Sequence, residues 1–555
     1  MEQDRSTVAE RASAGQGAAV ALRQAARPGS HIPLQRGLDP VTGPIRVPAM
    51  EPAGGPTRST SPRTRPGRGR HRRAERRRAE VTLTLIVLGA LSWIVVTWPF
   101  RGDQAVYALI GRQILHGQAL YTDIWDIKQP GVFLWYGLAD LTGLGEIGTR
   151  ALDVVAAFAF GACVHVLLRG RLTTPWVRRM LTALATAVLL LAAGPGDFGQ
   201  LEMLCLVPAT GAFALVAAEP RRAPTWRRIV LAGLCVGVVG VFKLLLAGVV
   251  GLALLVYLVL HLGGRRRFAA VPVVVAAALV PVGLTLAWLA TQGAFGAALH
   301  VWLVEALEMG SAPGSRDPAR VLEGLGRYVL WMFPVVVLAA WQAATAWRRR
   351  DPLDLAMGAF VLLDVLAIAT QFAWWYQWYF VSAPLVVLAL RRLDVLAPRL
   401  WGPRWAVLLA ALCLPMLAHA ASWALPTVLD GGGFTAASRD RIDERVAGYD
   451  TIRTELAAAG VRAGGSLYVV GDPLYNMLAG APLVVRFDGW TYDLMTDGQW
   501  REVATEVGAV EPAVVMVDAD AREWVADRGQ DLQQVLARDY VRYRTSAEGT
   551  WYRLR

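Results

Sequence analysis

Long apolar runs separated by short polar breaks dominate the chain between Val81 and Leu425. A helix needs about 20 apolar residues to cross the hydrocarbon core of a bilayer, so runs of this length predict membrane-spanning helices. The pattern therefore predicts a polytopic α-helical membrane protein. We predict about eleven spans, at residues 81–99, 148–168, 180–194, 203–218, 228–242, 244–262, 269–290, 325–347, 354–371, 377–392 and 404–424.

The arginines between these runs occur in alternate loops. Loops rich in Lys and Arg stay on the cytoplasmic side of a membrane. We therefore predict a cytoplasmic N-terminus and, after an odd number of spans, an extracytoplasmic C-terminus. The loop at 101–147 then faces outward, on the extracytoplasmic side. Eighteen arginines lie in the predicted inner loops, residues 169–179, 219–228, 263–268, 348–351 and 391–404.

The apolar stretch Gly131–Leu144 is too short to cross a bilayer. Counting it as a span would also place every later arginine-rich loop outside. We predict instead a short interfacial or re-entrant helix within the first outer loop, with Trp135 and Tyr136 at the level of the lipid headgroups.

After Leu425 the chain becomes a mixture of polar and apolar residues. The β-rich runs Leu467–Val470, Leu483–Phe487 and Val514–Val517 alternate with helical patterns near 439–459, 499–507 and 521–537. This alternation predicts that residues 430–555 form a small extracytoplasmic α/β domain. We interpret Gly471-Asp472-Pro473 as a turn at a strand end, because no nucleotide-binding fingerprint accompanies it.

Charge is unevenly distributed along the chain. Residues 1–80 contain 16 arginines against 7 acids and so carry +9 of the net charge of +12. Their low apolar content predicts a disordered cytoplasmic tail that sets orientation and contacts anionic lipid rather than nucleic acid. Among the 56 basic residues only Lys128 and Lys243 are lysines, and both are predicted at the outer face.

Candidate chemistry is concentrated in the first outer loop. Asp103 directly follows the first predicted span, and Asp126 and Lys128 lie further along the same loop. Asp103 is compatible with the N-cap of the next helix, and equally with a functional carboxylate beside a membrane cavity. A lysine ammonium suits a single phosphate oxygen as a point charge, whereas a snorkelling residue at a helix end is the alternative for Lys243.

The spacing of these residues resembles that of GT-C membrane glycosyltransferases, in the branch of protein O-mannosyltransferases (glycosyltransferase family 39) and aminoarabinose transferases. The resemblance extends over most of 81–555 and is most specific in the first loop. Gln104 and Gln129 depart from the family pattern, since a second acid and an uninterrupted Lys-Pro pair are usual there. The matching residues are Asp103, Tyr107, Gly117–Tyr121, Asp126-Ile-Lys128-Gln-Pro130, Gly145, Arg150, Gly237–Lys243 and Trp375–Tyr379 before Pro384.

The resemblance implies transfer of a sugar from a polyprenyl-phosphate donor to an extracytoplasmic hydroxyl on a glycan, lipid or protein, with inversion. It implies Asp103 as general base and Lys128, Lys243 and Arg150 as ligands of the donor phosphate. No cofactor is required, although Mg²⁺ or Mn²⁺ is compatible with oxygen ligands from Asp126, Asp197 and Glu202. Substrate contacts are expected from Tyr107, Tyr121, Asp126 and Tyr379.

Two other classes of protein remain open on the sequence alone. A transporter or flippase of envelope precursors would share the many spans, although such proteins often contain internal repeats and polar residues at mid-membrane. A non-catalytic envelope scaffold with a GT-C-like fold is compatible with the departures at Gln104 and Gln129.

Overall fold

The computed structural model describes residues 67–311, 318–371, 375–400, 402–429 and 449–555. His71–Arg555 form one compact unit, to which all contacts below belong. Helix α1 (Gly67–Val96) begins inside the tail that we predicted to be disordered, so for residues 67–80 that prediction is wrong. Arginine is a good helix former, which allows the basic segment to continue the apolar helix that follows it. The rest of the predicted tail, residues 1–66, lies outside the described residues.

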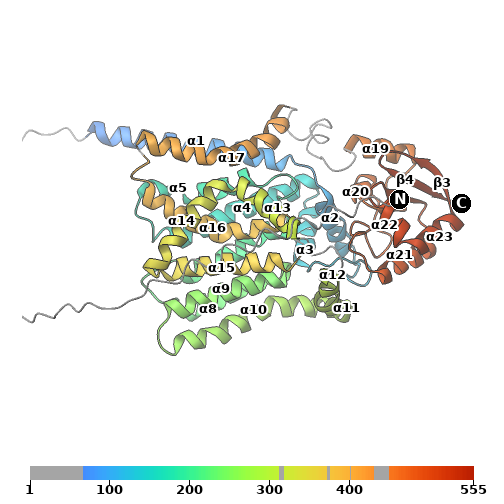
Figure 1. Cartoon of the computed structure of the whole chain (residues 1–555), viewed down its shortest axis with the longest axis horizontal. Helices are drawn as coiled ribbons and strands as arrows, with labels where there is room; N and C mark the ends of the chain where they lie inside the picture. Colours follow the sequence, from blue (N-terminus) through green and yellow to red (C-terminus); the bar gives the residue numbers. More distant parts are fainter. Residues whose placement is uncertain (1–66, 312–317, 372–374, 401, 430–448) are drawn as a thin grey trace, which may run out of the picture. The chain divides into compact units, whose positions relative to one another are not determined.

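Each predicted span coincides with helical structure (Figure 1). By length and composition, seven helices in the described ranges are suited to cross a membrane, or eight if a bent pair is one span, so the predicted number of eleven is not confirmed. A shorter apolar helical stretch lies at Leu201–Ala217. The helices are α1, α4 (Glu146–Leu168), α5 (Pro175–Ala192), α7 (Leu206–Ala217), α8 (Trp226–Phe242), α9 (Leu244–His261), α10 (Arg266–Thr291), α13 (Pro318–Trp331), α14 (Phe333–Arg349), α15 (Pro352–Ala369), α16 (Ser382–Leu396) and α17 (Pro403–Leu429).

Helices α13 and α14 form the bent pair, which replaces the single span predicted at 325–347. The angle between them is 95°. The bend falls at Met332, two residues before Pro334. Proline lacks an N–H group and disfavours helical backbone in the residue before it, so the helix ends there and a new one starts. The prediction of one continuous helix at this place is therefore wrong.

The first loop contains two short helices, α2 (Gly102–Leu115) and α3 (Gly131–Asp140). Helix α3 confirms a short helix in place of a span. It crosses α2 closely, because a Cβ atom on Gly111 would lie 2.6 Å from the carbonyl oxygen of Phe133. Tyr136 is not at a lipid surface as predicted: it is buried, and its hydroxyl donates to the carbonyl oxygen of Gly199.

Short helical segments join the longer ones. Their bounds are α6 (Leu201–Leu204), α11 (Phe295–His300), the π-helix η1 (Val301–Glu305), α12 (Ala306–Ser311) and the 3-10 helix η2 (Trp375–Val381). Segment α6 follows the loop at 194–200, and η2 precedes α16, so both carry residues that we predicted near the site.

The C-terminal region contains a four-stranded sheet with the order β1-β2-β4-β3. Strands β1 (Leu467–Val470) and β2 (Val514–Asp518) are parallel and were predicted, whereas the antiparallel strands β3 (Tyr540–Thr545) and β4 (Gly549–Leu554) were not. The run Leu483–Phe487 was predicted as a strand but does not belong to this sheet. It contacts the first loop, where the N–H of Trp125 donates to the carbonyl oxygen of Arg486 at 2.8 Å. The remaining helices are α19 (Tyr449–Ala458), α20 (Leu474–Ala479), α21 (Asp497–Val510), α22 (Arg522–Asp527) and α23 (Gln530–Asp539).

Candidate active site

A cavity of about 300 Å³ lies where the first loop meets the C-terminal region. The first loop contributes Arg101, Gly102, Asp103, Ile127 and Lys128, so the predicted base and one of the two lysines open into the same space. The C-terminal region supplies most of the opposite wall. The other lining residues are Gly196, Gln200, Tyr376, Gly471, Asp472, Trp490, Thr491, Tyr492, Asp493, Leu494, Asp518 and Asp520.

Asp103 lies in the first turn of α2, where Arg101 occupies the N-cap position. The carboxylate is therefore available for contacts outside its own helix. Its Oδ1 atom accepts a hydrogen bond of 2.7 Å from the indole Nε1 of Trp490. Gly102 makes this approach possible, since a Cβ atom there would lie 2.5 Å from the Trp490 ring. The C-terminal region thus orients the carboxylate of the first loop.

Lys128 lies beside Asp126, with Nζ 3.4 Å from the carboxylate. The ammonium also lies 5.1 Å from the ring centroid of Tyr107. Burial lowers the pKa of Lys128, but the carboxylates of Asp126, Asp103 and Asp488 together raise it above its ordinary value. The lysine is therefore a permanent cation at neutral pH, although its side chain is only 17% exposed.

Asp488, in the C-terminal region, contributes to the same electrostatic group. Burial and then the charge of Asp126 raise the pKa of Asp488 to about 7, against the lowering effect of the Trp490 N–H and Lys128. Burial likewise raises the pKa of Asp126, although Lys128 opposes the shift. Three acids thus act on one ammonium group, so this cluster carries no net positive charge.

Lys243 lies at the junction of α8 and α9, as predicted, and its backbone is the C-cap of the first and the N-cap of the second. Its Nζ atom lies 3.0 Å from Oε1 of Glu202 in α6. Gln200, two residues before Glu202, lines the cavity. Lys243 thus lies behind the cavity wall, in contact with the segment that forms it.

Arg150 does not face the cavity, contrary to our prediction. Its side chain has no exposed surface. Its guanidinium donates to the Oε1 of Gln104 and to backbone carbonyl oxygens, and it lies 3.5 Å from the carboxylate of Asp153, so its contacts are with neighbouring protein groups. Gln104 in turn donates to the loop at 195–198, which explains a glutamine at the position of the family's second acid. The carbonyl acceptors are those of Trp98, Pro99, Pro195 and Phe198.

The tyrosines predicted to bind substrate are buried and do not line the cavity. The hydroxyl of Tyr107 donates to Gln200, and that of Tyr121 donates to the carbonyl oxygen of Lys128 at 2.8 Å. Tyr379 donates to the carbonyl oxygen of Ala192 at 2.7 Å. Their hydroxyl groups contact the cavity-forming segments, and none of the three side chains lines this cavity. Asp126 is also absent from the lining and reaches the site through Lys128.

The three acids predicted as metal ligands are in separate contacts. Asp126 lies against Lys128, Asp197 accepts from the Tyr379 hydroxyl at 3.2 Å, and Glu202 pairs with Lys243. Among the residues that the structure describes, no group of three or more His, Cys, Asp or Glu side chains is arranged to hold a metal ion. The residues present therefore do not fit the predicted site for a divalent cation.

The sequence interpretation missed the C-terminal wall of the cavity. Asp472 follows β1 and Asp518 ends β2, so both lie at the carboxyl ends of two parallel strands. Ligands of α/β sheets bind at this edge, which is the signal that could have identified the Gly471-Asp472 turn as part of a site. Trp490 and Tyr492 follow the run that we mistook for a strand, and no local pattern marks them.

Comparison of the sequence with models of known protein families gives no match, and none of the curated proteins matches it. Solved structures do match. ArnT from Cupriavidus metallidurans, an aminoarabinose transferase of the GT-C class, superposes with a TM-score of 0.55 at 18% identity, over 85% of this chain and 97% of ArnT. The same protein bound to undecaprenyl phosphate gives the same score, identity and coverage of this chain, over 98% of that structure.

The archaeal oligosaccharyltransferase AglB from Archaeoglobus fulgidus, in complex with an inhibitory peptide and a dolichol-phosphate, gives a TM-score of 0.46 at 12% identity over 85% of this chain and 74% of AglB. The match to ArnT covers almost the whole of ArnT and most of this chain. The apolar helices, the first loop with its two short helices and the extent of the match agree with the resemblance seen in the sequence. The fold of this chain is therefore similar to that of ArnT.

Proposed function

We propose that this protein is a membrane glycosyltransferase that moves a sugar from a polyprenyl phosphate to a hydroxyl group at the outer face of a bacterial cell membrane. The observation that carries the proposal is the shared cavity of Asp103 and Lys128, an acid and a cation from one loop. The ArnT-like fold supports it, as does the undecaprenyl phosphate bound in one ArnT structure. The acceptor is a glycan, lipid or protein of the cell envelope.

In the proposed reaction the acceptor hydroxyl lies between Asp103 and the anomeric carbon of the donor. Asp103 takes the hydroxyl proton as the oxygen attacks, the new glycosidic bond forms, and the bond from the anomeric carbon to the phosphate oxygen breaks with inversion. A positioned general base of this kind contributes about 10²–10⁴-fold to a rate. The departing lipid phosphate gains negative charge, which Lys128 stabilises from within the cavity.

Lys243 has a second and less direct role in this proposal. It is paired with Glu202 behind the cavity wall, so it acts on the donor phosphate through the segment that carries Gln200 and Glu202. Trp490 holds one oxygen of Asp103 and leaves the other to the acceptor. Because Lys128 lies in the cavity and meets the phosphate charge, the proposed reaction needs no divalent cation.

The decisive experiment is a transfer assay with the full chain in membranes or nanodiscs, using polyprenyl phosphates that carry mannose, arabinose, glucose or an aminosugar. We expect release of the polyprenyl phosphate with at least one donor, also in the presence of EDTA. Counterflow of a lipid precursor in proteoliposomes without sugar transfer would instead establish a transporter. Absence of both activities, with the donors bound, would point to a scaffold.

Replacing Trp490 with phenylalanine is expected to lower the rate of transfer about 10- to 100-fold while donor affinity stays within about twofold. The reason is that a hydrogen bond to a charged group is worth about 1.5–3 kcal/mol, and each 1.36 kcal/mol of activation free energy is tenfold in rate. The measurement is kcat and KM for transfer in the purified variant.

The matched control for this change is Trp226→Phe, since Trp226 is an exposed tryptophan at the start of α8 and does not line the cavity. We expect it to transfer sugar at the wild-type rate. A Trp490→Phe variant with unchanged kcat would show that the indole does not orient Asp103.

A further inference from the structure

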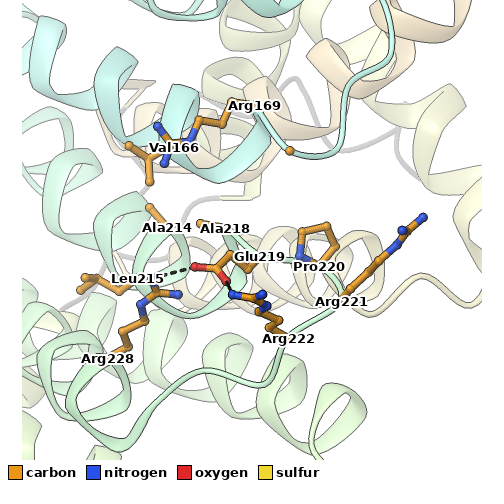
Figure 2. Close-up of a pocket in the computed structure, with 11 residues that line it drawn as sticks. Val166, Arg169, Ala214, Leu215, Ala218, Glu219, Pro220, Arg221, Arg222 and Arg228 are labelled. Atoms are coloured by element: carbon orange, nitrogen blue, oxygen red, sulfur yellow. Dashed lines mark ion pairs between the residues drawn. The ribbon is translucent and has the colours of Figure 1, made fainter.

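A second and larger cavity, of about 700 Å³, lies among α4, α7 and the segment that leads into α8 (Figure 2). Its apolar wall comes from Val166 on α4 and from Ala214, Leu215 and Ala218 at the end of α7. Apart from Gly170 and Pro220, the other residues of its lining are charged. Figure 2 shows Arg169 on one side of the opening, and Arg222 and Arg228 grouped around Glu219 on the other; Arg221 also contributes to the lining.

This cavity lies at the opposite ends of helices that reach the candidate active site. Helix α4 has 23 residues and carries Arg150 near its start and Val166 near its end. At about 1.5 Å per residue it is about 35 Å long, close to the thickness of a bilayer. Helix α8 likewise begins near Arg228 and ends before Lys243. The two cavities are therefore separated by the length of a membrane span.

The charges that line the cavity do not cancel. Glu219 pairs with Arg228 at 2.8 Å and lies 3.8 Å from Arg222. The hydrogen bond and charge of Arg228, with the other arginines, hold the pKa of Glu219 below its ordinary value, so this acid is ionised at neutral pH. Arg169 and Arg221 have no ion-pair partner among the described residues. Four arginines thus line a cavity that contains one carboxylate, with the Arg221 side chain extending away from Glu219 (Figure 2).

We propose that this cavity binds the phosphate-bearing headgroup of an anionic membrane lipid, with part of an acyl chain on the apolar wall. Arginine is suited to phosphate because its planar fork donates two parallel hydrogen bonds. Basic pockets between membrane helices bind phosphate headgroups of anionic lipids. The apolar wall favours a lipid over a free phosphate ion, because the ion has no apolar surface to bury there. This inference does not depend on the proposed sugar transfer.

The test is native mass spectrometry of the detergent-purified full chain, titrated in separate samples with phosphatidylglycerol, phosphatidylcholine and inorganic phosphate. We expect specific retention of phosphatidylglycerol and weak retention of phosphatidylcholine. We expect millimolar inorganic phosphate to displace little of the bound lipid. Equal retention of both lipids, or full displacement by inorganic phosphate, would overturn the proposal of a lipid headgroup site.

Two variants with opposite expected effects locate the site. Arg169→Gln should weaken phosphatidylglycerol binding about fivefold, since a basic residue near an anionic membrane surface contributes about 1 kcal/mol. Glu219→Gln should strengthen binding, because it removes the acid that competes for the arginines. Stronger binding by Glu219→Gln cannot arise from a loss of fold, because a misfolded variant would bind the lipid more weakly.

The matched control is Arg178→Gln, which removes an exposed arginine that does not line this cavity. It should leave binding unchanged. An equal loss in Arg178→Gln and Arg169→Gln would show a diffuse attraction by basic loops, and weaker binding in Glu219→Gln would contradict the role of the cavity charges. Either result would overturn the assignment.

Discussion

Replacing Asp103 with asparagine is expected to lower sugar transfer by about 10²–10⁴-fold, the contribution of a positioned general base. Asparagine keeps the shape of the side chain and can still accept the hydrogen bond from Trp490, so the cavity should remain intact. It has no carboxylate to take the acceptor proton. The measurement is kcat for transfer under saturating donor, together with the affinity for polyprenyl phosphate, which should change by less than about threefold.

Asp123→Asn is the control for this prediction. Asp123 is an exposed acid of the same loop whose Oδ2 atom accepts from the N–H of Ala119, a bond that asparagine can also accept. Transfer by this variant should match the wild type. Full activity of Asp103→Asn in a stably expressed protein would exclude Asp103 as the base and leave the GT-C fold unaffected.

Replacing Lys128 with methionine is expected to have two separate consequences. Transfer should fall by about 10²–10³-fold, because one group that stabilises the charge of the leaving phosphate is lost. Stability should also fall by about 3–5 kcal/mol, because removal of the ammonium leaves the buried Asp126 without its partner. Chemical denaturation and the transfer assay measure the two effects independently.

A double replacement separates these consequences. Lys128→Met combined with Asp126→Asn removes both charges, so most of the lost stability should return while transfer stays low. Lys128→Arg keeps the charge but places a planar guanidinium beside the Tyr107 ring, where the compact ammonium lies in the wild type. Compared with Lys128→Met, we expect this variant to recover more of the stability than of the transfer activity. Recovery of transfer in the uncharged double variant would show that Lys128 acts only as the partner of Asp126.

Much of the membrane architecture could be predicted because it depends on local composition. Each predicted span coincides with a helix, and the short helix Gly131–Asp140 was distinguished from a span by its length and by the arginines of the later loops. The bend at Met332 was not anticipated, although Pro334 supplied a local reason for it. Strands β1 and β2 were found because buried parallel strands are short apolar runs, whereas the half-exposed β3 and β4 carry no such signal.

The candidate site was predicted only as far as its first loop. Arg150 and Tyr379 matched positions of the family pattern, but the sequence does not say whether a polar side chain faces a ligand or a neighbouring backbone. In the structure the Arg150 guanidinium and the Tyr379 hydroxyl donate hydrogen bonds to backbone carbonyl oxygens of adjacent segments. A buried polar group requires hydrogen-bond partners. A polar residue near a site therefore often bonds to the backbone segments that form the site, and does not contact a ligand.

The amino-acid sequence by itself determined the membrane helices, the arginine-rich loops and the presence of Asp103 and Lys128 in one loop, since each depends on residues close together in the chain. The tertiary structure decided that Trp490, 387 residues after Asp103, holds that carboxylate. It also decided that the carboxyl ends of β1 and β2 close the cavity. Such contacts join distant segments through packing and hydrogen bonding, and no local pattern of hydrophobic and polar residues specifies them.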